Sequence, residues 1–153
     1  MRLNAKFIAA CFLVLALPAV ASATYIAGLT PVGDCNGWWV DATVRFRSTA
    51  FEADAILVVQ LTDLDMNVLD EQVIETTLTR EEGSYQTQVY SFAGEWAYYG
   101  PAGRYHVVAT LSISAERADG TIDEDEMTRL PKFTCGVVST EAATWSSVKG
   151  LYR

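Results

Sequence analysis

The side chains that could carry out acid–base or nucleophilic chemistry are few in this sequence. His106 is the only histidine, so any serine- or cysteine-based catalytic triad must use it. It alternates with the apolar side of a strand-like stretch and lies among Thr and Ser residues, without a Gly-x-Ser-x-Gly motif. Pairs of carboxylates cannot be assigned as catalytic, because that chemistry depends on their separation in space. We expect a surface or inter-strand histidine and a protein that is not an enzyme.

One polar segment resembles the start of a calcium-binding loop. Asp63, Asp65 and Asn67 have the required spacing, but Val68 stands where the loop needs glycine and Ile74 where it needs a glutamate. We therefore expect a polar hairpin turn here.

The densest group of acidic residues is Asp119 together with residues 123–126. Oxygen-rich loops between strands bind calcium in some extracellular modules. Neighbouring carboxylates on a strand point to opposite faces, however, which favours a solvated hairpin tip. We predict neither a metal nor a cofactor.

An aromatic segment lies between Gly94 and Gly100. Large rings are unusual in a solvated loop, and they either bind a sugar or a protein partner or cap the open end of a core. The residues that we expect to contact a ligand or partner are Glu95, Trp96, Tyr98 and Tyr99.

Residues 1–23 have the order of features found in a secretory signal peptide. Arg2 and Lys6 precede an apolar run over residues 7–20, and Ala21-Ser22-Ala23 is a small-residue cleavage site. The run is too short to span a membrane. A lipoprotein motif around Cys11 is rejected, because the apolar run continues after it. We expect a secreted mature chain that begins near Thr24.

Loss of Cys11 with the signal peptide leaves Cys35 and Cys135. In an oxidising compartment the simplest interpretation is one disulfide that joins the two ends of the domain. Trp38 and Trp39 follow the first of these cysteines, and we expect them in the core and at its rim respectively.

The composition indicates one acidic domain. The formal net charge is −8, and the only charged residues of the predicted signal peptide, Arg2 and Lys6, are basic, so its removal makes the chain more acidic. A surface of this sign disfavours nucleic acids and anionic lipids as partners.

Alternating apolar and polar residues predict extended strands. They cover residues 40–47, 56–61, 68–79, 85–92, 104–115 and 127–138. The apolar run 56–61 is expected to be a central strand that is covered on both faces. We expect Asp119-Gly120 to form a hairpin turn. Pro131 is expected to mark the edge of a sheet.

Residues 103–107 read Gly-Arg-Tyr-His-Val, which resembles the Gly-x-Tyr-x-Val pattern of immunoglobulin-like and fibronectin type III-like domains. Residues 61–68 likewise resemble a hairpin of bacterial immunoglobulin-like modules. The resemblance implies an antiparallel β-sandwich of about seven strands over residues 24–138, and a Tyr105 hydroxyl bonded to nearby backbone. Val107 stands where true immunoglobulin domains have cysteine, and the expected disulfide joins chain ends instead.

We expect residues 139–153 to form a C-terminal tail. A short helix would suit this tail, because Trp145, Val148 and Leu151 recur at a spacing of three. It is expected to be a frayed tail, a helix packed on the domain, or a docking or sorting signal. These features together predict a secreted bacterial extracellular or cell-envelope protein, non-catalytic, with an adhesion, structural or partner-binding role. The alternative is a small carbohydrate-binding module that uses the loop aromatics.

Overall fold

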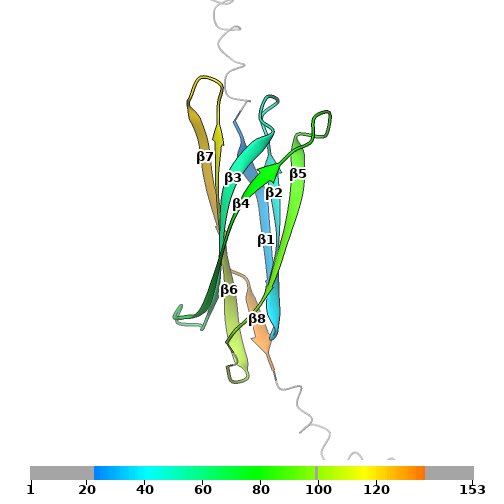
Figure 1. The fold of residues 1–153 in the computed structure, drawn as a ribbon. Helices are drawn as coiled ribbons and strands as arrows, with labels where there is room; N and C mark the ends of the chain where they lie inside the picture. Colours follow the sequence, from blue (N-terminus) through cyan, green and yellow to red (C-terminus); the bar gives the residue numbers. More distant parts are fainter. Residues whose placement is uncertain (1–22, 99, 137–153) are drawn as a thin grey trace, which may run out of the picture.

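The computed structural model describes residues 23–98 and 100–136, which form an all-β structure (Figure 1). The strands are β1 (Tyr25–Gly33), β2 (Gly37–Arg45), β3 (Glu52–Thr62), β4 (Val68–Thr79), β5 (Thr87–Glu95), β6 (Gly103–Glu116), β7 (Ile122–Arg129) and β8 (Lys132–Cys135). No helix among these residues is long and apolar enough to cross a membrane. The predicted signal peptide (except Ala23) and the C-terminal tail lie outside the described residues.

The strands form two antiparallel sheets that share one apolar core. One sheet has the order β1-β2-β5, and the other has the order β4-β3-β6-β7, with β8 also paired to β6. Inward side chains of both sheets alternate with outward polar ones, as in β2, where Val40, Ala42 and Val44 are fully buried. The largest buried side chains include Phe46, Leu57 and Leu111, which come from both sheets.

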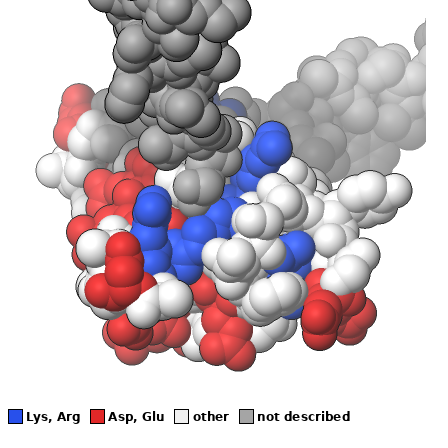
Figure 2. Space-filling model, turned by 90° about the horizontal axis from the view of Figure 1, so that it is seen from above, with Lys and Arg blue, Asp and Glu red and all other residues white. Residues whose placement is uncertain are grey.

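Loops gather at two ends of the molecule (Figure 1). We call the end formed by loops 46–51, 80–86 and 117–121 the arginine end. Arg80 is buried there, and its guanidinium donates hydrogen bonds to Ser48 O and Ala50 O, both at 3.0 Å. Figure 2 shows this end from above, with basic side chains towards the middle and acidic ones mostly along the rim. The opposite end, which contains loop 34–36 and β8, is called the disulfide end.

Two strands differ from the sequence prediction. β1 was not predicted because a bulge between Ile26 and Gly28 breaks its alternation, so the buried residues Ile26 and Leu29 are three apart. The single strand expected over residues 127–138 is two strands, β7 and β8, separated at Pro131. Within the part of the chain that the structure describes, both strands pair only with β6, which confirms the edge position of this proline.

The environments of four other residues can be compared with the prediction. Trp38 is in the core and Trp39 is exposed, as expected. β3 is central, because it pairs with β4 and β6, but Ile56 is 45% exposed, so the expectation that both faces are covered was wrong. Of the two environments expected for His106, the inter-strand one is found, because the residue is 5% exposed and pairs with Thr62 of β3 and Lys132 of β8. Neither of its ring nitrogens has a hydrogen-bond partner within the described residues.

Candidate functional site

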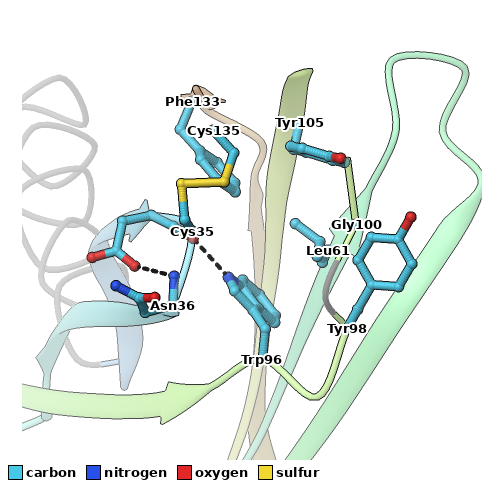
Figure 3. A pocket seen from close by; sticks show the side chains of 10 residues that line it. Cys35, Asn36, Leu61, Trp96, Tyr98, Gly100, Tyr105, Phe133 and Cys135 are labelled. Carbon is cyan, nitrogen blue, oxygen red and sulfur yellow. Dashed lines mark hydrogen bonds between the residues drawn. A yellow bond between two sulfur atoms is a disulfide. The ribbon is translucent and has the colours of Figure 1, made fainter. Parts of the chain in front are cut away.

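A pocket of about 230 Å³ opens between the two sheets at the disulfide end (Figure 3). The disulfide and Tyr98 lie on opposite sides of it, with Trp96 between them. Its walls are mainly aromatic and apolar. They are formed by Asp34, Cys35, Asn36, Leu61, Trp96, Tyr98, Gly100, Tyr105, Phe133 and Cys135. The fold therefore brings the predicted disulfide and two predicted contact residues to one place.

Trp96 is a rigid wall of this pocket. Its Nε1 donates a hydrogen bond to Asp34 O at 3.0 Å, and its ring centroid is 6.4 Å from that of Trp38. Only 3% of Trp96 is exposed. Its ring thus caps the core, which is one of the two roles considered for it, and it does not offer an open face for stacking.

Tyr98 lies at the rim and is half-buried against the core. Its loop is fixed by Asp70 of β4, whose Oδ2 accepts hydrogen bonds from Ala97 N at 2.6 Å and Tyr98 N at 3.3 Å. The ring packs over Gly100, where an added Cβ would overlap with Tyr98 Cε1. Tyr98 is therefore held in place and still accessible.

The other two predicted contact residues contribute less. Glu95 is exposed at the end of β5, outside the pocket wall. Tyr99 lies outside the described residues.

Tyr105 supports the pocket floor. Its hydroxyl donates a hydrogen bond to Pro101 O, and its ring centroid is 5.9 Å from that of Phe133. The bond from this hydroxyl to backbone a few residues upstream is the corner that the sequence resemblance implied.

The disulfide between Cys35 and Cys135 is confirmed and closes the remaining side. It joins the β1–β2 turn to the end of β8, with the Cα atoms 5.2 Å apart, and so connects the two sheets. Asp34 Oδ1 fixes the same turn by accepting hydrogen bonds from Asn36 N at 2.7 Å and Gly37 N at 2.9 Å. The wall residues are thus held by backbone, ring and disulfide contacts.

The polar groups in the pocket suit recognition. Asp34 is the only carboxylate among the residues that line it, and one of its oxygens already accepts two backbone hydrogen bonds. Asn36 and Tyr98 also line the pocket, on opposite sides of Trp96 (Figure 3). Such an arrangement can hold an apolar or aromatic group and orient it through a few polar contacts.

Two supporting residues of β4 were not identified from the sequence. Asp70 fixes the Tyr98 loop, and Gln72 accepts a hydrogen bond from Trp38 Nε1 at 3.2 Å while it donates one to Glu95 O. Both stand in an alternating strand pattern that does not show which sheet they face. Only the pairing of sheets places them beside the aromatic loop.

Gly94→Ala is expected to disturb this support. An added Cβ would lie 2.5 Å from Gln72 Oε1 and 2.8 Å from the Trp38 ring, and both distances are too short, so both contacts must be relieved by a shift. We expect a loss of about 1–3 kcal/mol in the free energy of unfolding, measured by urea denaturation. Gly28→Ala is the matched control, because its nearest contact would be an ordinary 3.7 Å. Equal stability of the two variants would contradict the prediction.

In the two acidic segments considered as metal sites, the carboxylates of Asp63 and Asp123 accept hydrogen bonds from other groups of the chain. Asp63 Oδ1 accepts hydrogen bonds from Asp65 N and Asn67 N, and its Oδ2 accepts one from Asn67 Nδ2. The bond from the Asn67 side chain is the main cause that lowers the pKa of Asp63. Within the described residues, no three His, Cys, Asp or Glu side chains are grouped as metal ligands. Asp123 is buried, so the expected solvated hairpin tip is wrong for this residue.

Neither a protein-family model nor a curated protein sequence matches this chain. Its fold is similar to part of a solved structure described as a beta-glucuronidase from glycoside hydrolase family 2. The sequence identity is 13% and the TM-score is 0.38, over 74% of this chain and 11% of that one. The chain thus spans a small part of that enzyme's length, and a likeness at this TM-score supports no inference about activity.

Proposed function

We propose that this chain is an exported, non-catalytic protein with an immunoglobulin-like β-sandwich fold that binds a partner protein at the disulfide end. The observation that carries this proposal is an aromatic-walled pocket whose accessible rim residue, Tyr98, is held in place. The signal-peptide-like pattern of residues 1–23 and the Cys35–Cys135 disulfide support export to an oxidising compartment. The Tyr105 corner supports the immunoglobulin-like fold.

The size of the pocket indicates what it accepts. Its volume of about 230 Å³ is below the roughly 300–1,000 Å³ of pockets for drug-sized ligands. One aromatic or aliphatic side chain of a partner fits that space better than an extended ligand. Fixed walls also reduce the entropy lost on binding, since few side chains have to be ordered. An adhesion or structural role would use the same contact.

The carbohydrate-binding alternative is supported by one feature, which is the partly exposed tyrosine ring of Tyr98 at the pocket rim. Sugar stacking requires an accessible ring face, however, and Trp96 is buried. Tyr98 alone offers a smaller stacking surface. We therefore place this alternative second.

Tyr98→Ala is expected to weaken binding at the pocket by about 5- to 30-fold, equivalent to roughly 1–2 kcal/mol. The measurement is a titration of the mature chain, followed by NMR, with N-acetyl-phenylalanine amide and with a chito-oligosaccharide. The amino-acid probe should shift signals of Leu61, Trp96 and Phe133. Tyr85→Ala is the control, because Tyr85 is 89% exposed in the loop at the arginine end.

The outcomes separate the two candidate functions. Shifts with the amino-acid probe that Tyr98→Ala weakens and Tyr85→Ala does not would support partner binding. Saturable shifts with the oligosaccharide alone would support the carbohydrate module. Shifts that are the same in both variants, or absent from the pocket, would contradict the proposed site.

A further inference from the structure

Asp123 of β7 is the centre of a buried charged cluster at the arginine end. Its side chain is only 5% exposed. Oδ2 accepts a hydrogen bond from Arg47 Nη1 at 2.8 Å, and Oδ1 accepts one from Arg117 Nε at 2.7 Å. Arg47 is itself fixed by Thr49 Oγ1 and Glu116 O. The carboxylate is therefore held in one position by two loops.

A further donor to this carboxylate is the backbone nitrogen of Thr24. Thr24 N donates to Asp123 Oδ2 at 3.0 Å, and Thr24 Oγ1 accepts a hydrogen bond from Arg47 N at 3.3 Å. Thr24 is 1% exposed, whereas Ala23 before it is exposed. The boundary between solvent and the packed domain thus falls at the Ala23–Thr24 peptide bond.

This bond is also where the sequence predicts signal-peptide cleavage. The two observations are independent, because one is a small-residue pattern in residues 21–23 and the other is the burial and hydrogen bonding of Thr24.

We propose that cleavage at Ala23–Thr24 creates an α-ammonium group that forms an ion pair with Asp123, so that export processing completes the buried cluster. The proposal rests on the predicted signal peptide. Hydrolysis consumes one water molecule: its oxygen stays on the Ala23 carbonyl carbon, which becomes a carboxylate, and the nitrogen leaves as the protonated amine of Thr24. The amide donor at 3.0 Å becomes a charged donor to the same oxygen.

The surroundings of the new amine include charges of both signs. Arg47 and Arg117 oppose a third positive charge, but both already donate to Asp123. Asp125 is a second carboxylate of β7. Its Oδ2 accepts a hydrogen bond from Ile26 N of β1 at 2.8 Å, two residues after Thr24. Because Ala23 is exposed, its removal opens the other ammonium hydrogens to water. Direct contact with the Asp123 carboxylate favours the protonated amine.

The position of the cut matters in this arrangement. A chain that begins at Ala23 keeps a neutral amide at Thr24, and one that begins at Tyr25 loses both Thr24 hydrogen bonds.

The test compares mature chains that begin at Thr24 with a free and with an acetylated α-amino group. Acetylation should lower the melting temperature by about 3 °C or more. The effect of acetylation should disappear in Asp123→Asn and persist in Asp125→Asn. Asp125 is the matched position, because in the wild-type chain its carboxylate accepts a hydrogen bond from Ile26 N of β1 and not from Thr24. An NMR titration of the Thr24 amine in the unmodified protein should give a pKa above that of a free α-amino group.

Three results would overturn the proposal. The first is a native exported chain whose intact mass shows a start other than Thr24. The second is an equal melting temperature for the free and acetylated chains. The third is an α-amino pKa at or below its ordinary value, a result that can be obtained even if Asp123→Asn does not fold.

Discussion

Reduction of the Cys35–Cys135 disulfide is expected to lower the melting temperature of the mature chain by roughly 10–20 °C. The bond joins residues 100 positions apart, so it closes almost the whole described domain into one loop. In the chain-entropy model a loop of this length is worth about 4–5 kcal/mol. The loss should be measured by circular dichroism with and without dithiothreitol.

A double variant, Cys35→Ser with Cys135→Ser, separates the bond from side effects of the reductant. It should melt at the temperature of the reduced wild-type chain and should not respond to dithiothreitol. Because both cysteines line the pocket, the variant should also bind the N-acetyl-phenylalanine probe more weakly at temperatures where it is folded. Unchanged melting of the fully reduced wild-type chain would contradict the assigned role of the bond.

Much of the fold follows from local sequence patterns. β6 was predicted almost to its ends because Tyr105, Val107, Ala109, Leu111 and Ile113 alternate without a break. The hairpin at Asp119-Gly120 followed from glycine, whose φ is 81° here. The disulfide required only the count of cysteines and the compartment that residues 1–23 indicated.

The parts that were not predicted depend on contacts between distant segments. The bulge in β1 interrupts the alternation of buried and exposed residues, and no local sequence pattern indicates the bulge. The burial of Trp96 depends on the β1–β2 turn, which supplies the carbonyl of Asp34, 62 residues earlier. Asp123 belongs to an acidic run that resembles a solvated tip, and it is buried only because Arg47 and Arg117 reach it.

Asp123→Asn is expected to lower the free energy of unfolding near neutral pH by about 3–5 kcal/mol, as for other broken buried ion pairs. Arg47 is 8% exposed and would lose its charged partner. Burial alone would raise the pKa of Asp123, but hydrogen bonds from Thr24 and Arg117, and the charges of Arg117 and Arg47, hold it below its ordinary value. A carboxyl with a lowered folded-state pKa stabilises the fold above its unfolded-state pKa. That stabilisation is lost as pH falls through the folded-state pKa.

Urea denaturation at a series of pH values tests both parts of this expectation. The curves of wild type and Asp123→Asn should be far apart at neutral pH and converge in acid, because protonation makes the wild-type group neutral as well. Asp119→Asn is the control: its pKa is also lowered, mainly by the Thr121 side chain, but it lies in an exposed turn. Its stability should stay close to that of wild type. Since asparagine can still accept the Thr24 and Arg47 hydrogen bonds, a constant offset at all pH values would assign the loss to altered packing, whereas convergence assigns it to charge.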